Sequence, residues 1–201
     1  NVAYWHMAVA YVRGKYNRRD TASPMLMGKC CHDLDLLAWY MSEVPVEKVS
    51  SFGSLRHFRS ENAPEGAGQR CLLDCEIESN CPYSARRLHV ENDYGWGGPW
   101  RHLENPDELS REDKVESLKN DNPHGRCVWH ADNTVVDHQC VSVEFAGGVT
   151  ATHDMWGNAA RRGRTVHIMG TKGEIEGDMS EGVINLRTFN PDAEGSFDVE
   201  R

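Results

Sequence analysis

Apolar and polar residues alternate with a period of two through much of this chain, which is typical of β-strands with one buried face. Two glycines, Gly147 and Gly148, separate two such segments and predict a hairpin turn. The glycines at 170 and 173 predict another tight turn. The alternation predicts strands over residues 2–12, 46–58, 134–145, 149–155, 164–169 and 183–189.

A helical period replaces this alternation in one early segment. Its apolar residues recur at i, i+4, i+7, i+8 and i+11, and they are Cys30, Leu34, Leu37, Ala38 and Met41. This spacing predicts a helix over residues 28–41, which Pro45 ends. Strands in series with one early helix favour an α+β fold: an open, mostly antiparallel sheet with helices on one face.

Residues 59–126 break both periods, because prolines and glycines recur throughout the segment. The segment is too long for an ordinary connection, so we interpret it as a loop-rich insertion without a core of its own. A helix is expected near residues 106–118, with Asn105 as its N-cap. The 201 residues are interpreted as a single domain that carries this insertion.

Charge and composition exclude some classes of protein. A net charge of −9 argues against nucleic acid as a partner, because a phosphate backbone requires a basic face. No apolar run approaches the roughly 18 residues of a membrane span, and no secretory signal is visible. Seven cysteines, with Cys30 and Cys31 adjacent, favour the reducing cytoplasm. The chain enters a strand-like pattern directly at Asn1, which suggests a piece of a longer protein.

Reactive side chains gather on the predicted helix. Lys29, His32 and Asp33 lie within one arc, and Asp35 follows His32 by three residues. A carboxylate beside an imidazole fixes its tautomer and raises its basicity, as general acid–base catalysis requires. The alternative is an ordinary helix start with a surface lysine and a capped histidine.

Two motifs carry a resemblance to a known family. The sequence His-Asp-Leu-Asp-Leu-Leu-Ala-Trp at residues 32–39 and Gly-Thr-Lys-Gly-Glu-Ile at residues 170–175 resemble the C-terminal domain of the Gfo/Idh/MocA oxidoreductases. Between them, residues 132–155 resemble that domain's strand, Gly-Gly hairpin and strand. The resemblance covers nearly the whole chain, and residues 59–126 are its least typical part.

The resemblance implies a two-domain enzyme whose N-terminal Rossmann domain binds NAD or NADP and carries a Glu-Lys-Pro lysine. The family pattern Asp-x-x-x-His-x-x-Asp would place its histidine on His32 and its second aspartate on Asp35. The first aspartate falls on Gly28, which is a departure from the pattern. Lys29, beside this gap, would then take a polar or proton-transfer role.

The chain has neither a G-x-G-x-x-G motif after a strand nor a Glu-Lys-Pro triplet. The chain by itself should therefore neither bind a dinucleotide nor catalyse a reaction. We therefore interpret it as the substrate-binding and oligomerisation half of a dehydrogenase for a sugar or polyol-like substrate. A sheet with one bare face implies a homodimer or homotetramer. The alternative is a non-catalytic binding or dimerisation module with a structural histidine. A third hypothesis is a metal-dependent hydrolase that uses His32, Asp33 and Asp35.

Four cysteines in or beside the insertion form a candidate zinc site: Cys71, Cys75, Cys81 and Cys127. Their spacing is not the paired C-x₂-C of a zinc knuckle, yet an insertion without a core is a natural place for a metal. The alternative is buried thiols that pack as small hydrophobes.

Further polar residues are weaker candidates for substrate contacts. Tyr11 and Arg13, at the end of the first predicted strand, and Arg164, before a later one, could reach a polar substrate. The pairs Asp137–His138 and His153–Asp154 lie on predicted strands, and their apolar neighbours suggest exposure on one face of the sheet.

Overall fold

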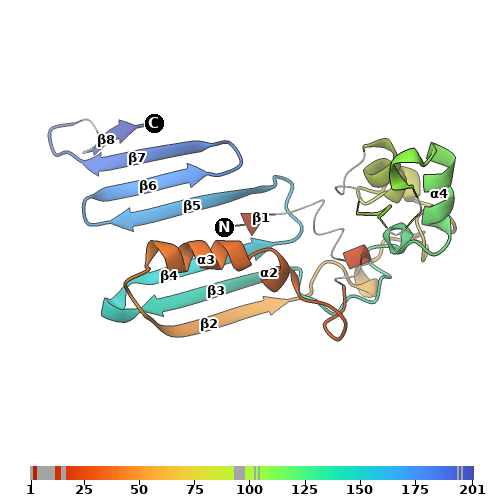
Figure 1. The fold of residues 1–201 in the computed structure, drawn as a ribbon, viewed down its shortest axis with the longest axis horizontal. Coiled ribbons are helices and arrows are strands. Elements are labelled where there is room, and N and C mark those ends of the chain that lie inside the picture. Colours follow the sequence, from red (N-terminus) through yellow and green to blue (C-terminus); the bar gives the residue numbers. More distant parts are fainter. Residues whose placement is uncertain are drawn as a thin grey trace.

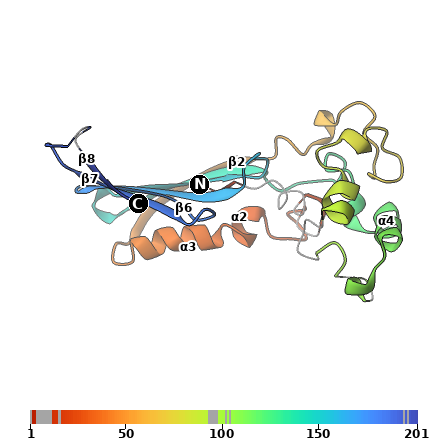
Figure 2. The same ribbon diagram turned by 90° about the horizontal axis from the view of Figure 1, so that it is seen from above.

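The computed structural model describes residues 2–3, 12–14, 17–92, 98–101, 103, 105–193, 195 and 197–201. One end of the molecule is a sheet, and the other is a lobe of short helices and loops (Figure 1). Two helices cover one face of the sheet, as the edge-on view in Figure 2 shows. The α+β fold with a mostly antiparallel sheet is therefore confirmed.

Within the described part of the chain, the sheet contains eight strands in the order β2-β3-β4-β1-β5-β6-β7-β8. Their bounds are β1 Val2–Ala3, β2 Val46–Ser54, β3 His138–Phe145, β4 Thr150–Trp156, β5 Gly163–Gly170, β6 Gly173–Asp178, β7 Val183–Phe189 and β8 Phe197–Glu200. Neighbouring strands are antiparallel except β1 and β4, which are parallel. Two antiparallel halves, β2–β4 and β5–β8, thus meet at the two residues of β1.

The first predicted strand is partly wrong. Val2 and Ala3 form β1, but Val12 and Arg13 have helical backbone. The last strand, β8, was not predicted, because its sequence is short and acidic. The other strands lie within a few residues of their predicted bounds.

The predicted helix over residues 28–41 corresponds to α3 (Cys31–Tyr40), and a separate short helix, α2 (Met25–Gly28), precedes it. The chain turns between them at Lys29, whose φ of −136° and ψ of −45° do not continue a helix. Alternate residues of β3 face α3, so Val141, Val143 and Phe145 form a buried cluster with Leu34 and other apolar side chains of this layer. This cluster fixes α3 on the sheet.

The lobe lies between β2 and β3, so the insertion spans residues 55–137 and is larger than predicted. It has a core, contrary to expectation. Two clusters fill it: one includes Phe58, Tyr83, Leu88, Val128 and Trp129, and the other Cys71, Ala85, Trp100 and Leu118.

The lobe contains the α-helix α4 (Arg111–Lys119). Asn105 was expected as its N-cap, but Asn105 precedes a separate 3-10 turn over Pro106–Glu108. Ser110 caps α4 instead, through a capping box with Asp113. None of the helices in the described part of the chain has the length and apolar character needed to cross a membrane.

Candidate functional site

The start of α3 is attached to the sheet by a buried carboxylate. Asp33 lies in the first turn of α3 and is 8% exposed. Arg164 of β5 donates its Nε hydrogen to Asp33 Oδ1 over 2.7 Å. His153 of β4 faces the same carboxylate, with its Nε2 3.9 Å from Asp33 Oδ2. Residues distant in the sequence therefore meet between α3 and the sheet.

Opposing effects act on the pKa of Asp33. Burial is the largest single effect and raises the pKa, because it disfavours the charged carboxylate. The contacts with His153 and Arg164 together outweigh burial, so the pKa of Asp33 lies below its ordinary value. Asp33 is therefore ionised at neutral pH, and its pair with Arg164 holds the first turn of α3 in place.

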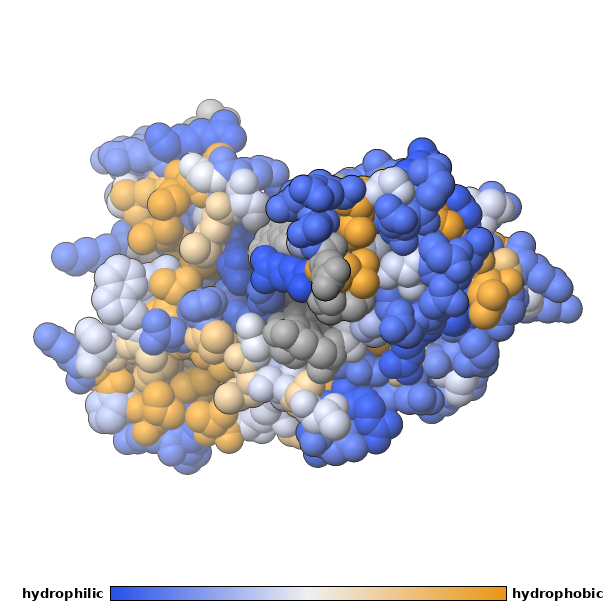
Figure 3. All heavy atoms as spheres, turned by 45° about the vertical axis from the view of Figure 1, so that its right-hand side comes forward, coloured by the Kyte–Doolittle hydropathy of each residue, from blue (hydrophilic) through white to orange (hydrophobic). Residues whose placement is uncertain are grey.

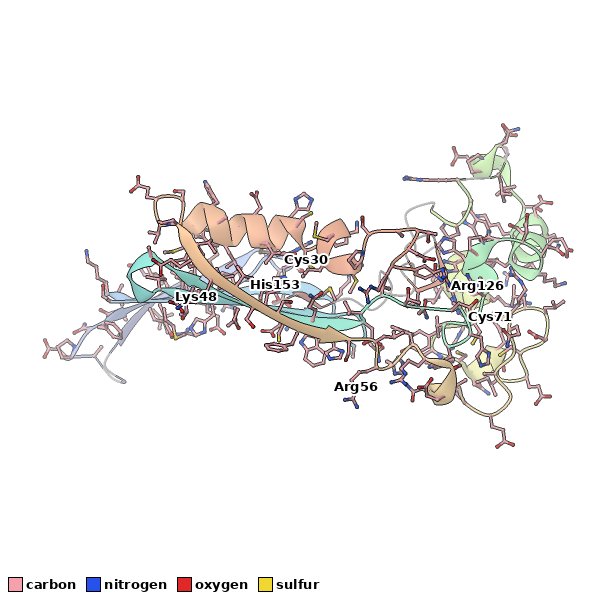
Figure 4. All side chains as sticks on the ribbon, turned by 90° about the horizontal axis from the view of Figure 1, so that it is seen from below. Cys30, Lys48, Arg56, Cys71, Arg126 and His153 are labelled. Atoms are coloured by element: carbon pink, nitrogen blue, oxygen red, sulfur yellow. The ribbon has the colours of Figure 1, made fainter. Side chains whose placement is uncertain are left out.

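Cys30 completes this cluster from the position just before α3. Its side chain is fully buried, and burial raises the pKa of its thiol to about 12. Its Sγ lies within 4.8 Å of ligand atoms of Asp33 and His153. In Figure 4, Cys30 and His153 lie in the layer between the helices and the sheet.

A hollow of about 700 Å³ opens beside this cluster. Asp33, His153 and Arg164 line part of it, and other residues of α3 and of β4–β7 line most of the rest. Among the described residues, β1 pairs with β4 and with β5 through Val2 and Ala3, between the two halves of the sheet. The candidate site is thus a polar cluster with open access from one side.

The predicted catalytic residues lie around this cluster. His32 and Asp35 are exposed on α3, and Lys29 is half-buried at the break between α2 and α3. The structure brings Asp33, rather than Asp35, against a histidine. The catalytic roles of His32, Asp35 and Lys29 stay predictions.

The predicted substrate contacts have different surroundings. Arg164 lines the hollow and pairs with Asp33, so its substrate contact stays a prediction. Arg13 is fully buried in the lobe, where its Nε donates to the Arg126 carbonyl over 2.6 Å. Its expected place at a strand end is therefore wrong, and its role in binding substrate stays a prediction. Tyr11 lies outside the described residues.

The four cysteines proposed for zinc all lie in the lobe. Cys71, Cys81 and Cys127 are buried, and Cys75 is half-buried. Burial raises the pKa of Cys81 to about 11, and a guanidinium nitrogen of Arg13 lies 3.1 Å from Cys71 Sγ. Among the described residues, three ligand atoms within 4.8 Å of one another occur at Cys30, Asp33 and His153, not among these four cysteines. Zinc at the lobe stays a prediction.

A second polar cluster joins the sheet to the lobe. Asp137 is 7% exposed, and it accepts hydrogen bonds from the backbone N–H groups of Arg56, His57 and Phe58 at 2.6 to 3.2 Å. His138 lies 3.1 Å from the same carboxylate. A smaller hollow of about 400 Å³ opens beside these residues. Arg56, at this junction, is labelled in Figure 4.

The expectation that Asp137–His138 and His153–Asp154 share one exposed face is wrong. Successive residues of a strand point to opposite faces, so His153 faces α3 while Asp154 faces the other side. The sequence pointed to His153 as polar, but nothing in it indicated Cys30 and Asp33 as its neighbours. The i, i+3 spacing of Cys30 and Asp33 was the one available signal.

Comparison with known proteins finds a similar curated protein named "Putative oxidoreductase YteT", from Bacillus subtilis (strain 168). It is 24% identical over 173 residues, which cover 81% of this chain and 36% of that protein. The chain therefore spans little more than a third of this relative's length. No family model matches the chain, and no solved structure matches it. The similarity supports an oxidoreductase-like role.

Proposed function

We propose that this chain is the substrate-binding and oligomerisation domain of a NAD(P)-dependent oxidoreductase that acts on a sugar or polyol-like substrate. The observation that carries the proposal is the attachment of α3 through Asp33 and Arg164, which presents His32 and Asp35 outward on a fixed helix. Similarity to a protein named as an oxidoreductase supports the same class.

Four residues of this chain would have distinct roles in proton transfer and substrate binding. His32 takes the proton from a substrate hydroxyl, Asp35 orients the imidazole, and Lys29 contacts a substrate oxygen. Arg164 lines the adjoining hollow and would contact a further hydroxyl. A nicotinamide cofactor, bound mainly by another domain, supplies the hydride chemistry. Gly28 stands where the family pattern has an aspartate, so Lys29 is the polar group at that point.

The bare parts of the sheet support an assembly of several copies. Figure 3 shows apolar side chains gathered at the sheet end of the molecule, on the face that carries α3. Ile168, Ile175 and Ile184 of β5–β7 lie on this face and are 38% to 64% exposed. Apolar patches of this kind are typical of interfaces. We propose a homodimer or homotetramer in the cytoplasm, with contacts through the sheet.

The first test is the coding sequence before Asn1, which should encode a strand, a G-x-G-x-x-G turn, a helix and a later Glu-Lys-Pro segment. The second is His32→Ala in the longest natural form of the protein. Turnover should fall by about 100-fold or more, since a positioned acid–base group contributes that much. Cys31→Ser, an exposed neighbour, is the matched control.

Retained turnover in His32→Ala would contradict the catalytic assignment and favour the alternative, a non-catalytic binding or dimerisation module. The half-buried position of Lys29 and the absence of the family aspartate at residue 28 are the observations that favour this alternative. A reading frame that starts near Asn1 would also favour it.

A further inference from the structure

Three buried polar atoms beside α3 have no hydrogen-bond partner among the residues that the structure describes. They are Asp33 Oδ2 and both ring nitrogens of His153, a residue that is 3% exposed. Leaving a buried donor or acceptor unpaired costs about 1–3 kcal/mol, and most such groups in proteins are paired. Two of these atoms, His153 Nε2 and Asp33 Oδ2, lie 3.9 Å apart, too far for a hydrogen bond. A species between them would satisfy both.

The Sγ atom of Cys30 lies close to Asp33 and His153. Cys30 and Asp33 are three residues apart at the start of α3, so their side chains project to one side of the helix. Their ligand atoms and one nitrogen of His153 all lie within 4.8 Å of one another. We propose that Cys30, Asp33 and His153 bind a zinc-like divalent metal ion.

The donor set suits zinc. One thiolate, one carboxylate oxygen and one imidazole nitrogen are ordinary zinc ligands at about 2.0–2.3 Å. Tetrahedral bonds of that length place ligand atoms about 3.3–3.7 Å apart, close to the spacing of Asp33 and His153. Three protein ligands leave a fourth position, which opens toward the hollow of about 700 Å³ lined by Asp33 and His153. Zinc sites with an open position bind water or substrate there.

Arg164 acts on this site from outside. Its Nε holds Asp33 Oδ1, so the other oxygen, Oδ2, remains directed toward His153. Partners of this kind orient metal ligands. The guanidinium charge repels a cation, but the thiolate and the carboxylate balance the two charges of the metal. The site does not depend on the proposed nicotinamide chemistry, so either proposal can fail without the other.

The test is binding of Co²⁺, a spectroscopic substitute for zinc, to the metal-free protein. One equivalent should bind and give a sulfur-to-cobalt charge-transfer band in the near ultraviolet, and zinc should displace it. Cys30→Ser should abolish the band, and His153→Gln should weaken binding by about 100-fold or more. Cys31→Ser, the exposed neighbour, should retain the band. Circular dichroism of each metal-free variant monitors folding.

A measurement on the unmodified chain guards against variants that fail to fold. Bound zinc should protect Cys30 from alkylation under partially unfolding conditions, while Cys31 reacts freely, as mass spectrometry of the peptides would show. Absence of cobalt binding would overturn the proposal, and a buried water would then satisfy the three atoms. A band that survives Cys30→Ser but disappears in Cys81→Ser would overturn it too, because the metal would then lie in the lobe.

Discussion

Two buried carboxylates, Asp33 and Asp137, connect distant parts of the molecule. Asp33 is held by side chains of β4 and β5, whereas Asp137 is held mainly by the backbone of residues 56–58. In both, burial would raise the pKa, but hydrogen bonds and charges lower it below the ordinary value. A charged carboxylate is tolerated in these interiors because each has a donor in place: Arg164 Nε for Asp33 Oδ1, and backbone N–H groups for Asp137.

Asp137→Asn should destabilise the chain by about 2–3 kcal/mol at pH 7, because an amide nitrogen replaces one acceptor that faces backbone N–H groups. Urea unfolding measures the loss, with the exposed Asp107→Asn as control. The folded pKa is depressed, so the stabilisation is present above the unfolded value of 3.8 and is lost as pH falls through the folded pKa. The free energies of unfolding of the wild type and Asp137→Asn should therefore converge below that pH. A stability difference that stays the same as the pH falls would contradict this explanation.

Arg164→Met should destabilise the chain by about 3 kcal/mol, since Asp33 would remain buried without its cationic partner. The pKa of Asp33 should rise at the same time, which NMR titration of its carboxyl carbon can follow. Arg162→Met changes an exposed arginine two residues earlier and should be nearly neutral. Equal stabilities of the two variants would show that the contact does not hold α3.

Local backbone chemistry decides where the elements begin and turn. Ser110 and Asp113 exchange hydrogen bonds of 3.1 and 3.0 Å at the start of α4. Gly173 begins β6 with a φ of +151°, where a side chain would meet the Arg187 carbonyl oxygen at 2.0 Å. The cap is local in sequence, whereas the need for glycine at residue 173 depends on the neighbouring strand β7.

Ser110→Ala should lower the free energy of unfolding by about 1 kcal/mol, because the N-cap of α4 is lost. Faster amide exchange confined to α4 is the expected signature. Ser42→Ala, at an exposed position beyond α3, is the control. Unchanged exchange in α4 would indicate that the lobe packing alone fixes this helix.

Gly173→Ala should destabilise the β5–β8 half by about 3 kcal/mol, because the new methyl group would force β7 away from β6. Gly147→Ala is a matched comparison: its φ is +81°, but an added Cβ has nothing within 4 Å. Gly147→Ala should lower the free energy of unfolding by only about 1–2 kcal/mol, because a residue with a Cβ would then adopt the left-handed backbone region. Urea unfolding compares the two, and equal losses would rule out the steric explanation.

The molecule as a whole leaves much of its sheet uncovered. The two helices on the sheet pack on the β2–β4 half, while both faces of β5–β8 lack a helix in the described part of the chain (Figures 1 and 2). On the face away from α3, Phe52, Met169 and Phe189 are 68% to 77% exposed. A stable protein would cover such a surface with another chain or domain.

The double substitution Phe52→Lys and Phe189→Lys should convert an assembly into monomers, because charged side chains resist burial at an interface. Sedimentation velocity of the wild type should show a dimer or tetramer. Met27→Lys, an exposed apolar residue on α2, should leave the assembly intact. A monomeric wild type at micromolar concentration would exclude self-association through the sheet.

Period-two alternation and turn glycines were sufficient to predict β2–β5, β7 and the turn that leads into β6, because these signals depend on neighbours within a few residues. The short helix α2 was not predicted, since the helical spacing of apolar residues begins only at Cys30, after the break at Lys29. The cap of α4 was assigned to Asn105 rather than Ser110, although the Ser-x-x-Asp signal was present. The core of the lobe was missed because its aromatic and cysteine residues are scattered between prolines and glycines.

The candidate site, like the fold, was predictable from the sequence only in part. Local spacing identified the reactive segment around Lys29, His32 and Asp35, whose roles stay predictions. Tertiary structure alone decided that Asp33 meets His153 and Arg164, more than a hundred residues away, and that Arg13 is buried in the lobe. Periodicity is a property of adjacent residues, whereas these contacts depend on which strands become neighbours and which face each side chain takes.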